Sequence, residues 1–471
     1  MGLNLISLEF VVFFAVAAVT YYVINHRARW MLLLAASLGF YYLALPIGIV
    51  PLILTALFNY IGARALGSAT GKTQKILFYL LIAINLLALI AYKILLSPYA
   101  TIISKSFEGL ILPIGLSFYI FTQMSYIMDV YSEKIKPEKH IGYYALYVSF
   151  FPKLVAGPIE RAGNFLGQIT KKVSFDEKRV TDGLKLILFG FFKKAVIVEL
   201  MARLVNPIYS NVAGHTGQDF AIATVIYAFQ IFYDFSAYTD IAIGGAKIFG
   251  FDLSQNFNLP YLAGSVREFW RRWHITLSSW FRDYLYIPLG GNRVPSWMRS
   301  LNVFMVFMTV GLWHGFTLTF LAWGMLHGFY IAASSLTSGL RTGISKITGL
   351  GRVPRISHVL SIVATFMMIC ASWVFFRANS IKDSVHIFSN IFNGWNLSQL
   401  GTTFGIAELE IVGAAILAVE TIHYLHSRKS SFIPSLSPVL RWPVYLLAIW
   451  LIIMFLISGN VFNQNFIYAR F

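Results

Sequence analysis

The chain has 471 residues, of which 57% are hydrophobic and only 12% are charged, whereas roughly 25% of the residues in a soluble domain carry a charge. This composition excludes an ordinary soluble domain and favours a polytopic membrane protein. The net charge of +17 is typical of basic cytoplasmic loops beside anionic lipids rather than of nucleic-acid binding, and it also suits a phosphate-bearing substrate. The single cysteine, Cys370, excludes an internal disulfide and a cysteine-rich metal site, and its apolar neighbours predict a buried side chain.

Apolar segments of membrane-spanning length recur along the chain. They predict helices near residues 5–25, 31–45, 47–66, 76–97, 110–130, 181–205, 220–246, 300–313, 316–335, 357–376, 405–426 and 441–459. The first segment lacks the basic start and the cleavage site of a signal peptide, so we expect it to be retained. The sequence therefore predicts an all-α polytopic membrane protein of about 11–12 transmembrane helices, with residues 1–471 in a single domain.

Two segments, 141–160 and 265–290, differ from simple membrane spans. The first is apolar but ends in FPKLVAGPIER, and the second is rich in both charged and aromatic residues. Both features are typical of re-entrant or interfacial helices. We expect these two segments to enter the membrane from one face without crossing it.

The loops predict an orientation. Residues 26–29, 64–75, 133–139 and 341–355 are rich in Lys and Arg, whereas 206–219 contains neither. Basic loops stay in the cytoplasm. The alternation of basic and non-basic loops agrees with this rule if both termini are extracytoplasmic and the two unusual segments enter from the cytoplasmic face.

A cationic face is expected on segment 265–290. If the segment is one continuous helix, five polar residues at spacings of 4, 3, 4 and 4 lie on one side: Arg267, Arg271, His274, Ser278 and Arg282. Such a helix can lie on anionic lipid, or it can form the cationic wall of a cavity with His274 at its centre. Pro288 and the pair Gly290–Gly291 are expected to end it.

His314 lies in the apolar sequence VGLWHGFTLTF, residues 310–320. Gly311 and Gly315 flank it without side-chain bulk, so that a ligand or a neighbouring backbone can approach closely. An unperturbed imidazole titrates near pH 6.5, which suits a general base, and a hydrogen bond to a neighbouring helix is the competing role. His327 lies 13 residues further on and is expected off the His314 face.

Other chemistries have little support in the sequence. It contains no HExxH, P-loop or GxSxG motif and no set of three histidines at metal-ligand spacing. Asp234 and Asp240 lie in an apolar run, where ion coupling, helix capping and interhelical hydrogen bonding all stay open. We therefore expect no metal and no bound cofactor.

Five stretches carry a resemblance to a known family. They are FPKLVAGPIERAGNFLGQI (151–169), YDFSAYTDIAIGGAKIFGF (233–251), REFWRRWHITLSSWFRDYLYIPLGGNR (267–293), GLWHG (311–315) and the terminal FIYARF (466–471). Together they resemble the membrane-bound O-acyltransferase family, and within it the alginate O-acetyltransferase branch. The resemblance covers essentially the whole chain and implies a ring of membrane helices, with re-entrant helices, around a central funnel or tunnel.

The resemblance also implies roles. His314 matches the essential histidine of the family and is expected to be the catalytic base, and His274 matches the second catalytic histidine. The implied donor is cytoplasmic acetyl-CoA, the implied acceptor is an exported polysaccharide, and the implied partner is an extracytoplasmic SGNH-type acetyltransferase. The residues expected to bind donor or substrate are Arg267, Arg271, Ser278, Arg282, Trp313 and Gly315.

Four further residues are expected to support the site. Intramembrane charges usually pair, so Glu160 and Arg161 are expected to pair with each other or with segment 267–282, and Asp283 with Arg282. Asn292 completes this group. Two other functions stay open: a D-alanyl transferase fed by a carrier-protein thioester, and a non-enzymatic transporter or lipid scramblase in which His314 is a gate or proton site.

Overall fold

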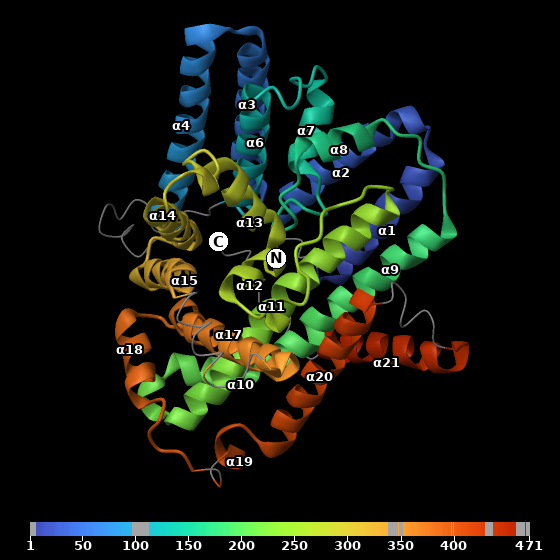
Figure 1. Ribbon diagram of the computed structural model, residues 1–471. Coiled ribbons are helices and arrows are strands. Elements are labelled where there is room, and N and C mark those ends of the chain that lie inside the picture. Colours follow the sequence, from blue (N-terminus) through green and yellow to red (C-terminus); the bar gives the residue numbers. More distant parts are fainter. Residues whose placement is uncertain are drawn as a thin grey trace. The chain divides into compact units, whose positions relative to one another are not determined.

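The computed structural model describes residues 6–96, 113–337, 347, 352–396, 398, 400–428, 437–457 and 467. Every regular element within these ranges is a helix, as the all-α prediction requires. The chain divides into two compact units, and Figure 1 draws the helices of both. The first unit comprises Met1–Lys194, Phe235–Gln255 and Ser458–Phe471, and the second comprises Ala195–Asp234 and Asn256–Ile457. The expectation of a single domain stays a prediction.

The described part of the first unit begins with eight α-helices. They are α1 (Leu8–Val23), α2 (Arg29–Ala44), α3 (Ile49–Ser68), α4 (Gly71–Leu96), α6 (Leu116–Tyr131), α7 (Ile141–Ser149), α8 (Ala162–Ile169) and α9 (Glu177–Phe192). Side-chain caps define two of their starts, since Ser7 accepts a hydrogen bond from the Phe10 backbone N–H and Asp176 accepts one from that of Arg179. The same unit contains the end of α11 (Gly217–Ile248), from Phe235 onward.

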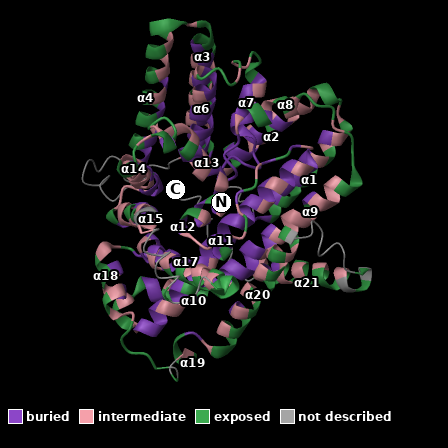
Figure 2. Ribbon diagram, viewed as in Figure 1, coloured by how far each residue is buried: buried purple, intermediate pink, exposed green. Residues whose placement is uncertain are grey.

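Helix α6 forms the core of the group α3, α4 and α6, which stand side by side in Figure 1. Asn59 on α3 donates hydrogen bonds to the side chains of Asn85 on α4, at 3.0 Å, and Gln123 on α6, at 2.7 Å. Such amide contacts join helices where the apolar surroundings offer no water. Apolar residues of α4 are instead exposed, and Figure 2 colours this helix mainly as exposed or intermediate, which suits contact with lipid.

The second unit contains the segment of most functional interest. Its helices are α10 (Glu199–Ser210), α11 up to Asp234, α12 (Val266–Arg272), α13 (Ile275–Phe281), α14 (Ser296–His314), α15 (Leu318–Leu336), α17 (Pro354–Arg377), α18 (Ile381–Asn390), α19 (Leu400–Thr403), α20 (Ile406–Arg428) and α21 (Pro438–Ile457). A π-helical turn, Arg282–Tyr286, follows α13. Cys370 on α17 is buried, as expected.

Several helices are suited to crossing a membrane. Four in the described ranges are long and apolar enough: Pro46–Ser68, Gly71–Leu95, Gly217–Ile248 and Pro354–Arg377. Three shorter apolar helices are Leu8–Val23, Leu318–Ser334 and Arg441–Ile457. Within the predicted segment 181–205, a π-helical stretch (Lys193–Val198) lies between α9 and α10.

The two unusual segments are not simple spans. Helix α7 has nine residues, which is about 14 Å of helix against a hydrocarbon core of about 30 Å. The segment 265–290 contains α12 and α13, each of seven residues. Neither segment crosses a bilayer as a single helix.

Candidate active site

His314 is the last residue of α14, and its ring is enclosed by aromatic side chains. It is 3% exposed. Its ring centroid lies 5.0 Å from that of Trp323 on α15 and 5.1 Å from that of Phe376 on α17. The helix ends because Gly315 leaves helical geometry and Thr317 starts α15 as its N-cap.

The glycines beside His314 bring two helices together. A Cβ on Gly311 would lie 2.5 Å from the carbonyl oxygen of Phe320, and one on Gly324 would lie 2.4 Å from that of Phe307. A Cβ on Gly315 would lie 2.8 Å from the Phe320 ring. Of the two approaches left open by the sequence, ligand or backbone, the structure thus assigns the space beside Gly311 to the backbone of α15.

His274 lies at a break in the chain rather than within a helix. Its φ and ψ are 41° and 55°, in the left-handed region, and it separates α12 from α13. The prediction of one continuous helix over 265–290, with five polar residues on one side, is therefore wrong. The spacing argument assumed 3.6 residues per turn throughout, and the turn at His274 interrupts that period.

The polar residues of segment 265–290 differ in their exposure to solvent. His274 is buried, whereas Arg267, Arg271 and Arg282 are exposed. The Ser278 hydroxyl donates a hydrogen bond to the carbonyl of Trp273, at 3.2 Å. The three arginines are therefore accessible to solvent, whereas the imidazole that lies between them in the sequence is buried.

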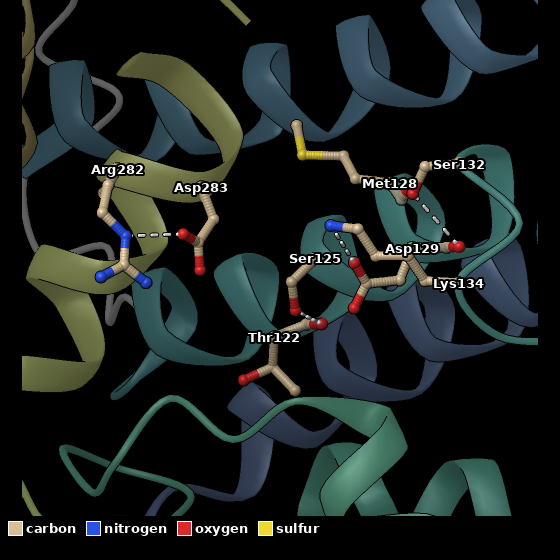
Figure 3. Close-up of polar contacts among 8 residues, drawn as sticks. All are labelled: Thr122, Ser125, Met128, Asp129, Ser132, Lys134, Arg282 and Asp283. Atoms are coloured by element: carbon tan, nitrogen blue, oxygen red, sulfur yellow. Dashed lines mark hydrogen bonds and ion pairs between the residues drawn. The ribbon is translucent and has the colours of Figure 1, made fainter. Parts of the chain in front are cut away.

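The expected pairing of Arg282 with Asp283 is confirmed. Arg282 Nε lies 2.8 Å from Asp283 Oδ1, and Figure 3 shows this contact. The exposed Asn292 accepts a hydrogen bond from the Tyr286 hydroxyl, at 2.9 Å. Both contacts lie at the surface of the chain that follows α13.

Trp313 lies beside two histidines of the second unit, His274 and His314. Its ring centroid lies 6.5 Å from that of His274 and 4.7 Å from that of His314. The three rings come from two different places, the α12–α13 break and the end of α14. The residues singled out as the catalytic pair are thus neighbours across one indole.

Sequence reasoning missed Asn256, which holds His274. Asn256 is 1% exposed, and its Oδ1 lies 3.2 Å from His274 Nδ1. The same oxygen accepts hydrogen bonds from the backbone N–H and the hydroxyl of Thr276. A polar residue a few positions before Pro260 was the available signal, but its partner lies 18 residues away.

His327 also belongs to the aromatic surroundings of His314. Its ring lies 4.9 Å from that of Trp323, whose ring in turn contacts His314. The prediction that His327 lies off the His314 face assumed one helix, and that assumption is wrong: His314 ends α14, whereas His327 lies on α15. Packing of α15 against α14 places both on Trp323.

Glu160 and Asp240 belong to the first unit. The Glu160 carboxylate accepts hydrogen bonds from the backbone N–H and the hydroxyl of Ser254. Its predicted pairing with Arg161 or with segment 267–282 stays a prediction. Asp240 forms an ion pair with Lys193 at 2.7 Å, so interhelical pairing is the role that the structure supports for it.

No metal centre is evident where the structure describes the chain: no group of three or more His, Cys, Asp or Glu side chains could hold an ion there. The expected absence of a metal and of a bound cofactor stays a prediction. The terminal motif FIYARF lies outside the described residues except for Ile467.

Comparison with known proteins decides the family. Residues 138–376 match the model of the membrane-bound O-acyltransferase family. The chain is a membrane-bound O-acyltransferase. This O-acyltransferase is therefore a multi-pass membrane enzyme, and the matched region contains both His274 and His314.

Individual relatives agree with this assignment. The O-acyltransferase is 33% identical over 434 residues to a probable alginate O-acetylase of Pseudomonas aeruginosa, covering 87% of this chain and 78% of that protein. It is 32% identical over 415 residues to a peptidoglycan O-acetyltransferase of Helicobacter pylori, covering 79% and 75%. A teichoic acid D-alanyltransferase of Bacillus subtilis is 26% identical over 292 residues, covering 57% and 69%.

Proposed function

We propose that this enzyme takes acetyl groups from cytoplasmic acetyl-CoA and passes them across the membrane for O-acetylation of an exported polysaccharide. The observation that carries the proposal is the placement of His274 and His314 on the same indole, Trp313. Relatives named for O-acetylation of alginate and of peptidoglycan support acetyl as the acyl group and a glycan as the acceptor.

In the proposed reaction His314 is the general base. It takes the proton of an acceptor hydroxyl, and the hydroxyl oxygen attacks the carbonyl carbon of the acetyl thioester. The C–S bond breaks as the ester C–O bond forms, and the proton passes from His314 to the departing thiolate. A general base contributes about 10²- to 10⁴-fold to such a rate.

The residues around the histidines have proposed roles in binding the donor. Arg267, Arg271 and Arg282 are exposed cations, which suit the phosphates of coenzyme A. Ser278, Trp313 and Gly315 are proposed to contact the donor close to the reacting thioester. His274 either orients the thioester or stabilises the charge that develops on its carbonyl oxygen.

The proposed setting is the bacterial cytoplasmic membrane, with both termini extracytoplasmic. Basic loops support this orientation. An SGNH-type acetyltransferase outside the membrane is the proposed partner that completes transfer to the glycan. Acetyl-CoA is a substrate in this scheme and not a bound cofactor.

Inverted membrane vesicles test the proposal directly. Vesicles given acetyl-CoA labelled in the acetyl group are expected to release free coenzyme A and to pass the label to the partner or the glycan. His314→Ala should lose this transfer by at least about 10²-fold while the protein stays folded in the membrane. His386→Ala is a matched control, since His386 is half-buried beside Phe220 in the same unit. Equal transfer by wild type and His314→Ala would refute the role of His314.

D-Alanyl transfer is the second candidate, favoured by the similarity to a teichoic acid D-alanyltransferase. It differs in its donor, a carrier-protein thioester. Purified enzyme given each donor in turn separates the two candidates. Turnover only with the D-alanyl carrier would replace acetyl-CoA as the donor.

A further inference from the structure

The side chain of Asn256 is the centre of a small buried hydrogen-bond cluster. Its Oδ1 is 3.1 Å from the Thr276 backbone nitrogen, 2.8 Å from the Thr276 hydroxyl and 3.2 Å from His274 Nδ1. Asn256 and His274 are each 1% exposed. All three contacts converge on one carboxamide atom, so the identity of that atom determines the protonation of the imidazole.

The Thr276 backbone resolves which carboxamide atom this is. A backbone N–H can only donate, so the atom that it contacts must be the amide oxygen and not the amide nitrogen. Since an oxygen faces His274 Nδ1, that ring nitrogen must carry the proton of the hydrogen bond. A neutral imidazole has one N–H only, so the lone pair of neutral His274 is on Nε2.

The backbone holds the ring in place as well. The Asn256 carbonyl accepts a hydrogen bond from the Ile275 N–H, and the Asn258 N–H donates one to the Arg272 carbonyl, both at 2.9 Å. These two bonds bracket His274, whose left-handed φ of 41° is unfavourable for a residue with a Cβ. The backbone of residues 256–258 therefore holds the strained turn, and the Asn256 side chain contacts the imidazole within it.

We propose that Asn256 is a positioning residue which keeps His274 in the Nδ1–H tautomer, so that a proton taken up by the neutral ring goes to Nε2. The inference rests on the proposed function and sharpens it. A neutral Nδ1–H ring cannot donate from Nε2 to a developing oxyanion. Of the two roles proposed for His274, orientation of the thioester therefore remains. The neutral ring accepts a hydrogen bond at Nε2 from a hydroxyl or an amide N–H of the substrate.

Nitrogen NMR tests the tautomer without any substrate. Enzyme labelled with ¹⁵N-histidine, compared with His274→Ala, isolates the signals of the His274 ring, in which protonated and unprotonated nitrogens differ in shift. The expected spectrum of the neutral ring has the proton on Nδ1, and Asn256→Ala should yield a mixture of tautomers. A wild-type ring protonated at Nε2 alone would overturn the proposal, whatever the enzyme acylates.

Steady-state kinetics test whether the contact between Asn256 and His274 affects turnover. Asn256→Ala should lower kcat by about 10²-fold because the His274 ring is no longer held in its reactive orientation. The KM for acetyl-CoA should change little. Asn256→Asp keeps an oxygen acceptor for the same donors and should recover most of the rate. Asn302→Ala is the matched control, since Asn302 is a buried asparagine of the same unit that donates to the Leu289 carbonyl.

The outcomes of these experiments distinguish failure of the role proposed for Asn256 from failure of the proposed acetyl-CoA donor. Full activity of folded Asn256→Ala, or Asn256→Asp no more active than Asn256→Ala, would overturn the role of Asn256. If wild-type enzyme has the expected tautomer but does not turn over acetyl-CoA, the proposed donor fails while the assignment of the His274 ring stands.

Discussion

The indole nitrogen of Trp270 donates a hydrogen bond to Nδ1 of His327, at 3.1 Å. Because Nδ1 accepts here, the neutral His327 ring carries its proton on Nε2. His274 has the opposite arrangement, with Nδ1 donating to Asn256. Two buried histidines of one unit are thus held in opposite tautomers by their neighbours.

Loss of the acceptor on His327 is expected to destabilise the second unit. In His327→Phe the buried Trp270 N–H has no acceptor, which costs about 1–3 kcal/mol. His327→Gln keeps a side-chain oxygen and should cost less. Thermal unfolding in detergent measures both variants. A Tm for His327→Phe equal to that of wild type would mean that this hydrogen bond contributes nothing.

Close packing of α14 on α15 is expected to make Gly324 intolerant of a methyl group. Gly324→Ala places a Cβ 2.4 Å from the Phe307 carbonyl oxygen, so the helices must separate. Overpacking of this kind costs about 1–3 kcal/mol. Gly413→Ala on α20 is the control, since its Cβ meets nothing within 4 Å. A lower Tm is expected for Gly324→Ala alone, and equal Tm values would contradict the close contact.

Trp313 is expected to contribute to both stability and activity because its ring lies between those of two histidines. Trp313→Ala removes the side chain that both rings contact and should lower both the Tm and acetyl transfer. The stability loss for a buried tryptophan is about 3–5 kcal/mol. Trp313→Phe retains an aromatic ring and should recover part of each. Wild-type transfer by Trp313→Ala would show that the indole has no part in placing the histidines.

Neutralising Arg271 is expected to weaken donor binding. Arg271 is exposed on α12, so its attraction to the phosphates of coenzyme A is screened by water. Arg271→Gln should raise the KM for acetyl-CoA by about 2- to 5-fold, and the effect should shrink at high salt. Lys382→Gln, which removes an exposed cation on α18, should leave that KM unchanged. Equal KM values for wild type and Arg271→Gln would show that Arg271 does not contribute to binding of the donor.

Helix positions were predictable from the sequence because spanning helices need long apolar runs. The predicted segments 47–66 and 357–376 correspond to α3 and α17 within three residues at each end. Segment 265–290 was not predictable in the same way. Its charged and aromatic pattern fits helical spacing throughout, and the break at His274 follows from hydrogen bonds to residues 256–258, which are distant in the sequence.

The sequence by itself determined that this chain is an all-α membrane protein and, through motifs that resemble those of a known family, identified His274 and His314 as candidate catalytic residues. Apolar length and local motifs are properties of neighbouring residues. Only the tertiary structure decided what surrounds the two histidines. It placed Trp313 beside both rings, buried His274 while leaving three arginines of the same segment exposed, and set the Asn256 oxygen on His274 Nδ1. Contacts of this kind join separate elements, so their geometry depends on how the helices pack and not on the spacing of residues along any one of them.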